Sequence, residues 1–155
     1  MEQAKIAILI AEISRQKEEI EKIYAKIKQR SANLKSKTQV ESLAYHLHNL
    51  YCAYEDIFKI VSDAFENNIE EGITYHKELL RRMSVSIEGI RPRLITQEAL
   101  SLLSELRAFR HFFRHAYTYE LDTSKVKIVL EKALKLKDIF KKDLDNFITA
   151  LKKIK

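Results

Sequence analysis

Basic and aromatic side chains alternate in one short segment of the sequence, which holds the residues best suited to chemistry. The segment is Arg107-Ala-Phe-Arg-His-Phe-Phe-Arg-His-Ala-Tyr117, with three arginines, two histidines and a tyrosine. A helix turns about 100° per residue, so the basic and the apolar side chains of the segment fall on two different arcs of the helix surface. The basic arc contains Arg107, Arg110, His111, Arg114 and His115. The apolar arc contains Leu102, Leu106, Phe109, Phe112, Phe113 and Ala116. The apolar arc can therefore anchor in a core while the basic arc stays accessible.

These residue types suit phosphate chemistry. A guanidinium is a bidentate partner for a phosphate, and an imidazole titrates near neutral pH and can transfer a proton. Cleavage of RNA requires a base for the ribose 2′-hydroxyl, an acid for the leaving oxygen, and cationic donors for the phosphoryl charge. The same pattern also occurs on solvated basic helix faces, so the residues alone leave both interpretations open.

The two histidines of the segment have the spacing of helical zinc ligands, because His111 and His115 are one turn apart. However, no glutamate follows His111, as it would in a His-Glu-x-x-His motif. Arg110 and Arg114 would also place positive charge beside a bound cation. We therefore expect no metal site at this pair.

A second histidine, His48, lies one turn before the single cysteine, Cys52. A thiolate–imidazole pair is conceivable there, but no third orienting group is indicated, so a structural role is favoured. His46 and His76 are isolated in the sequence, and we expect them to cap, pack or face water. Neighbouring carboxylates, such as Glu55 with Asp56 and Asp63 with Glu66, are interpreted as solvated or ion-paired.

The elements that must position these residues are all predicted to be helices. Two glycines and one proline leave little for hairpin turns. Apolar residues recur at spacings of three and four in long stretches. The predicted helices cover about residues 3–30, about 40 to 68, 76–83, about 97–118, and from Asp122 to the end of the chain. Thr96 and Asp122 are predicted to be N-caps.

Long helices with short connections favour antiparallel neighbours. The expected fold is all-α, an up-and-down antiparallel bundle of about five helices, and residues 1–155 are expected to form a single domain.

The net charge of +6 is concentrated near one end. Residues 125–155 contain ten lysines against four acidic residues, which favours an anionic partner such as nucleic acid. One cysteine allows no internal disulfide. The longest early apolar run, 6–11, is too short to span a membrane. We therefore expect a cytoplasmic protein that has no membrane partner.

The segment resembles a known family. Arg110-His-Phe-Phe-Arg-His115 fits the Arg-x4-His motif of HEPN-domain ribonucleases, and Ala116-Tyr117 extends it to the Arg-x4-His-x-Tyr form of the HepT toxins. His111 occupies the polar position after the arginine. The resemblance continues through Tyr54-Glu-Asp-Ile-Phe58 and His76-Lys-Glu-Leu-Leu80, so it covers about residues 45 to 120.

The resemblance implies a metal-independent endoribonuclease without a cofactor, the toxin half of a prokaryotic toxin–antitoxin pair. It further implies a homodimer in which two motifs approach across a basic cleft. His115 would transfer protons, Arg110 would bind the phosphate, and His111 would assist. Charge and geometry, rather than the family, assign Arg107 and Arg114 to the RNA backbone. Transfer RNA is the first substrate to test.

The resemblance also implies regulation. In the HepT branch a minimal nucleotidyltransferase antitoxin transfers AMP from ATP to the tyrosine of the motif, here Tyr117, and the added phosphates would block the anion site. Tyr119 is a secondary candidate. Two alternatives remain open at this point. One is a non-catalytic HEPN-like module that binds RNA or a nucleotide, and the other is a helical scaffold with a solvated basic face.

Overall fold

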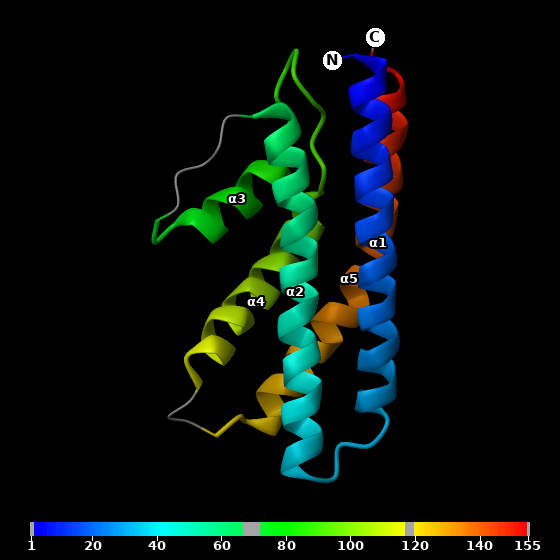
Figure 1. Ribbon diagram of the computed structural model, residues 1–155. Coiled ribbons are helices and arrows are strands. Elements are labelled where there is room, and N and C mark those ends of the chain that lie inside the picture. The colour runs from blue at the N-terminus through cyan, green and yellow to red at the C-terminus, as the bar shows by residue number, and fades with distance from the viewer. Residues whose placement is uncertain (1, 67–71, 117–119, 155) are drawn as a thin grey trace.

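The computed structural model describes residues 2–66, 72–116 and 120–154 (Figure 1). These residues form five α-helices: α1 Gln3–Ser31, α2 Lys37–Phe65, α3 Tyr75–Met83, α4 Gln97–Arg114 and α5 Thr123–Lys152. The prediction of an all-α bundle of about five helices is confirmed. Within the described residues, no helix combines the length and apolar character that crossing a bilayer requires.

The long helices alternate in direction along the molecule. In Figure 1, α1 runs away from the termini and α2 returns beside it; α4 then runs away obliquely and α5 returns, so both termini lie at one end. Each helix contributes to one buried apolar cluster. Inside it, the Tyr24 hydroxyl lies 2.6 Å from the Tyr54 hydroxyl and donates to the Ala133 carbonyl at 2.8 Å. This chain of polar contacts joins α1, α2 and α5.

The start of α4 is held by a contact across the bundle. Thr96 is the N-cap, as predicted, and its side chain accepts from the Ala99 amide. Asp143 of α5 in turn accepts from the Thr96 amide at 2.8 Å and the Thr96 hydroxyl at 2.9 Å. Asp143 is buried, so its carboxylate makes these charge-assisted bonds away from water. The basic segment therefore projects from a helix whose first turn is fixed to α5.

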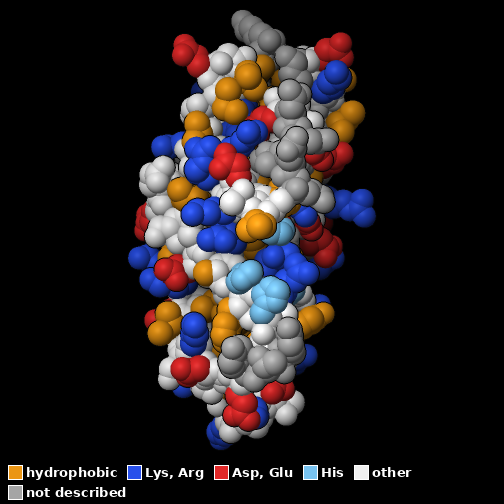
Figure 2. Space-filling model, turned by 90° about the vertical axis from the view of Figure 1, so that its left-hand side faces the viewer, with side chains coloured by type: hydrophobic (Ala, Val, Ile, Leu, Met, Phe, Trp, Pro, Cys, Tyr) orange, Lys and Arg blue, Asp and Glu red, His pale blue; other side chains and the backbone are white. Residues whose placement is uncertain are grey.

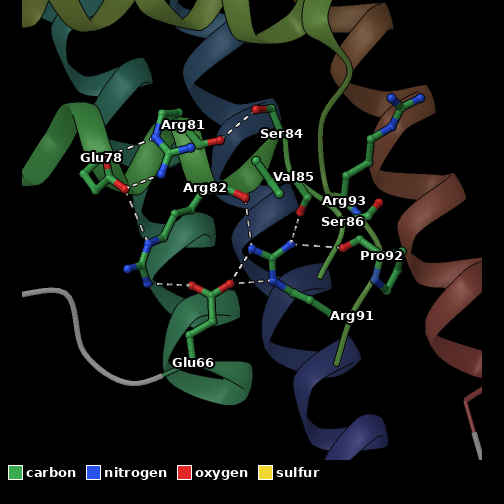
Figure 3. A network of polar contacts seen from close by, with 10 residues as sticks. All are labelled: Glu66, Glu78, Arg81, Arg82, Ser84, Val85, Ser86, Arg91, Pro92 and Arg93. Atoms are coloured by element: carbon green, nitrogen blue, oxygen red, sulfur yellow. Dashed lines mark hydrogen bonds and ion pairs between the residues drawn. The ribbon is translucent and has the colours of Figure 1, made fainter. Parts of the chain in front are cut away.

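The connection from α3 to α4 is pinned by a buried arginine (Figure 3). The Arg91 side chain is 0% exposed and pairs with Glu66 at the end of α2. It also donates to the carbonyls of Val85 and Arg82, each at 3.0 Å. Gly89, with φ of 77°, makes the turn that brings Arg91 back to this position. These bonds tie the loop to both α2 and α3.

The end of α2 differs from the prediction. The helix ends at Phe65 rather than near Asn67 and Asn68, which lie outside the described residues. Glu66 follows with an extended backbone, φ −130° and ψ 158°. The pairing of its carboxylate with Arg91 accounts for the early end, because it is a tertiary contact that the local sequence pattern does not encode.

Candidate functional site

The part of the basic segment up to Arg114 lies on α4, and its two arcs are separated in part as the sequence predicts, because Phe112 and Phe113 of the apolar arc are only half-buried. Leu102, Leu106 and Phe109 are buried, whereas Arg107 and Arg110 are half-buried. The remaining members of the basic arc, His111, Arg114 and His115, are exposed. Figure 2 shows histidine side chains gathered among Lys and Arg side chains in the middle of one face of the molecule. The α4 helix thus presents imidazoles and guanidiniums together to solvent.

The helix that carries the motif ends earlier than predicted. It stops at Arg114 rather than at about residue 118, and His115 is the C-cap with φ −107° and ψ 12°. The His115 amide donates to the Phe112 carbonyl at 3.1 Å, a tight closing turn. The residues that follow, Tyr117-Thr118-Tyr119, have low helix propensity, which explains the early end. Tyr117 and Tyr119 lie outside the described residues.

The two motif histidines contact each other. The ring centroids of His111 and His115 are 4.6 Å apart, with the ring planes at 60°. Two imidazoles this close can serve as base and acid towards one bound group. Within residues 2–66, 72–116 and 120–154, no three His, Cys, Asp or Glu side chains are grouped so that they would hold a metal ion.

Unpaired polar atoms mark the contact between α2 and α4. Four buried side-chain nitrogen or oxygen atoms of the described residues have no hydrogen-bond partner, and three of them are Tyr51 Oη, Arg107 Nε and Arg110 Nε. Each such atom costs about 1–3 kcal/mol of folding free energy. We call Tyr51 and Glu55 of α2, with Arg107 and Arg110 of α4, the α2–α4 seam. A ligand with acceptor atoms would relieve the unpaired arginine donors.

Charges of both signs act on the Tyr51 hydroxyl at the centre of the seam. Burial raises its pKa above the ordinary value of 10.0, and the Glu55 carboxylate raises the pKa further. Arg107 and Arg110 act on this pKa in the opposite direction. The tyrosine therefore stays protonated, as a neutral hydroxyl between one carboxylate and two guanidiniums.

His48 borders the seam on the side of Arg114. Its ring lies 5.1 Å from the Phe113 ring, and its Nε2 is 4.0 Å from the Cys52 sulfur. Burial lowers the pKa of His48, and the charges of Arg110 and Arg114 lower this pKa further, against a raising contact with the Asn49 side chain. His48 is thus held neutral beside the arginines.

A buried carboxylate–imidazole pair lies at the other end of the seam. Glu55 is 3% exposed, and its two carboxylate oxygens lie 2.8 and 2.9 Å from His76 Nδ1. Lys59 Nζ is 3.7 Å from the same carboxylate. From the sequence, His76 is expected to cap, pack or face water, and the structure adds a hydrogen bond to Glu55 that this expectation does not include. Glu55 is ion-paired, one of the two expected states.

The sequence did contain a signal for these α2 residues. His48, Tyr51, Glu55 and Lys59 follow each other at spacings of three and four along a helix whose other residues include a long apolar stripe. Such spacing places them on one stripe, and a polar stripe inside a buried helix requires partners. The partner on α3 could not be read from the sequence, because His76 is 21 residues from Glu55.

A pocket of about 520 Å³ adjoins the last turn of α4. It is lined by residues from the start of α2, the end of α4 and the connection to α5, including Lys37, Glu41, Phe113, Arg114, Ala116 and Leu121. Lys37 also pairs with Glu120 across its rim. The end of the motif helix therefore borders a hollow in the surface.

An all-α bundle with an Arg-x4-His sequence at the end of a helix fits the class of HEPN-type proteins. Residues 42–151 match the family described as HepT-like protein, so the chain belongs to the HepT-like family. The resemblance to the HepT family is confirmed by this match, which includes the whole basic segment. No curated protein and no solved structure matches the chain. Family membership indicates a HEPN-type toxin.

Proposed function

We propose that this protein is a metal-independent endoribonuclease, the toxin of a prokaryotic toxin–antitoxin pair. One observation supports the proposal most strongly: Arg107 and Arg110 each keep a buried Nε atom that has no hydrogen-bond partner among the described residues. Two exposed histidines follow, His111 on α4 and His115 at its C-cap. Unpaired cationic donors next to imidazoles are the groups that a phosphodiester requires. Membership in the HepT-like family supports the same activity.

In the proposed reaction, the groups of the motif carry out two proton transfers. One imidazole accepts the proton of the ribose 2′-hydroxyl, and the 2′-oxygen forms a bond to phosphorus. The bond from phosphorus to the 5′-oxygen breaks, and the leaving oxygen receives a proton. His115 is the main proton-transfer residue, and His111, in ring contact with it, assists. Arg110 stabilises the charge on the phosphoryl oxygens, and Arg107 and Arg114 bind the RNA backbone.

The active form is a homodimer whose two motifs face one basic cleft. The antitoxin is a minimal nucleotidyltransferase that transfers AMP to Tyr117. Only Ala116 separates this tyrosine from His115 in the sequence, so the added phosphate would compete with RNA for the arginines. Transfer RNA is the first substrate to test.

Cleavage by purified variants tests the proposal. We expect Arg110→Ala and His115→Ala to abolish RNA cleavage in the presence of EDTA while the helical content is unchanged. Arg93→Ala removes the same charge from an exposed position outside the basic segment and should leave cleavage intact. Full cleavage by the His115→Ala protein would refute the assignment.

One observation favours a second candidate, a non-catalytic module that binds RNA or a nucleotide. The side chains of His111 and His115 make no hydrogen bond or ion pair to the residues described in the structure, and a catalytic histidine is commonly oriented by such a bond. The binding module predicts that wild-type protein binds RNA without cutting it, and that Arg110→Ala weakens this binding.

A further inference from the structure

A further imidazole, that of His76, lies outside the Arg-x4-His motif. His76 belongs to α3, and its Nδ1 lies 2.8 Å from a Glu55 carboxylate that is almost fully buried. A buried carboxylate is expensive unless it is paired, so the bundle holds this imidazole firmly. Because a carboxylate only accepts hydrogen bonds, Nδ1 must donate.

The other ring nitrogen of His76 is left for a ligand. The Nε2 atom makes no hydrogen bond to the described residues, and the side chain is 35% exposed. The bond at Nδ1 fixes the orientation of the ring and therefore of Nε2. With Nδ1 donating to Glu55, Nε2 donates to a phosphate when it also carries a proton, so the phosphate-binding form of His76 is the imidazolium. A partly exposed imidazole with one tethered and one open nitrogen is a defined binding group, whereas a solvated histidine has no fixed orientation.

Two residues of α2, Glu55 and Tyr51, connect the His76 imidazole with the arginines of α4. Tyr51 is one turn before Glu55 on α2, and neither its buried hydroxyl nor Arg107 Nε makes a hydrogen bond of good geometry to the described residues. Glu55 and Arg107 both act on the pKa of that hydroxyl, in opposite directions. Glu55 contacts His76 of α3, Tyr51 is one turn away on α2, and α2 packs against the α4 helix that carries Arg107. His76, Glu55, Tyr51 and Arg107 therefore line the contact of α2 with α3 and α4.

Distance along α4 separates Arg107 from the proposed reaction centre. Arg107 precedes His115 by eight residues, which corresponds to about 12 Å along a helix. A single phosphate cannot contact both ends. A strand of RNA bound at Arg110 and His115 would present a different phosphate at Arg107.

We propose that His76, oriented by Glu55, and Arg107 together bind a second phosphate of the RNA strand, outside the bond that is cut. His76 and Arg107 are binding residues in this arrangement, and Glu55 is a positioning residue. The proposal rests on the proposed function because it takes RNA as the ligand. It adds a subsite from α3, an element outside the Arg-x4-His motif.

The test uses binding of a single-stranded 2′-O-methyl RNA oligonucleotide, which lacks the attacking hydroxyl and cannot be cut. The variant is His76→Asn, whose side-chain amide can still donate to Glu55 where Nδ1 does, but has no counterpart of Nε2. We expect about tenfold weaker binding. The slope of log K against log salt should fall by about 0.7, the value for one phosphate contact in a single strand.

A double variant distinguishes one shared phosphate from two separate ones. If His76 and Arg107 bind the same phosphate, His76→Asn with Arg107→Ala should lose less affinity than the sum of the two single losses. The control variant is His46→Asn. It changes a half-buried histidine of α2 that lies within the electrostatic influence of Arg30 and Lys26 of α1, and it should bind like wild type.

Unchanged affinity and salt slope in His76→Asn, or strictly additive losses in the double variant, would overturn the subsite. Failure of the proposed function would look different: wild-type protein would cut no RNA, yet the binding pattern of the variants would persist. Cleavage by wild type without the binding pattern would instead retain the function and remove the subsite.

Discussion

Among the described residues, Arg107 and Arg110 each keep one buried nitrogen without a hydrogen bond, although Arg91 of the same bundle has its guanidinium fully engaged. Arg91 has a structural role, whereas Arg107 and Arg110 are suited to binding a ligand. Arg91 ties a loop to two helices, and its bonds are made within the fold. The arginines of the seam are held in place by α4 but lack partners, which is expected where a ligand supplies the missing acceptors.

At the scale of single residues, replacing Arg110 should weaken RNA binding without lowering the free energy of unfolding. Arg110→Met retains an unbranched apolar chain and removes the unpaired donor. We therefore expect the free energy of unfolding in urea to stay equal or rise by up to about 2 kcal/mol, while RNA binding weakens.

The matched control is Arg91→Met, which leaves Glu66 buried without its main partner. It should lower the free energy of unfolding by about 3–5 kcal/mol. A comparable loss of stability in Arg110→Met would show that Arg110 is structural, against the account given above.

Among the elements, α4 matters most because it carries the motif, and its position depends on one side chain of α5. Asp143 accepts two hydrogen bonds from Thr96 at the first turn of α4. We expect Asp143→Ala to reduce the free energy of unfolding by about 1–3 kcal/mol, since the Thr96 donors lose their partner. Faster amide exchange at the start of α4 should accompany the loss.

Asp145→Ala is the control for this change. Asp145 is two residues away on α5, more than half exposed, and paired with Lys17 only at 3.8 Å. Exposed pairs of this kind contribute at most about 1 kcal/mol. Equal effects of the two substitutions would exclude a specific role for Asp143 in holding α4.

Local sequence patterns predicted the elements better than their connections. The helices, the caps at Thr96 and Asp122, and the two arcs of the basic segment follow from periodicity and capping, which act over a few residues. Asp143 lies 47 residues from Thr96, and His76 lies 21 from Glu55. Such contacts depend on how helices pack, so periodicity could not reveal them.

For the whole molecule, regulation should appear as a change in mass. The proposed nucleotidyltransferase antitoxin, co-expressed with this protein, should add AMP to Tyr117, and the intact mass should rise in steps of one AMP. The modified protein should no longer cut RNA, because the added phosphate occupies the arginines.

Tyr117→Phe should abolish the mass increase, whereas Tyr119→Phe should retain it. Loss of the increase only in Tyr119→Phe would move the modification to that residue. An unchanged mass in wild-type protein would contradict this mode of regulation.

The central claim is that the exposed end of α4 cuts RNA through the ribose 2′-hydroxyl without a metal. The most direct measurement compares one RNA substrate with the same strand carrying a single 2′-deoxy nucleotide at the cleavage position, both incubated with wild-type protein in EDTA. The account predicts cleavage of the RNA, with a 2′,3′-cyclic phosphate on the product, and no cleavage at the 2′-deoxy position. Cleavage of the deoxy-substituted bond, or no cleavage of RNA until a divalent metal is supplied, would contradict it.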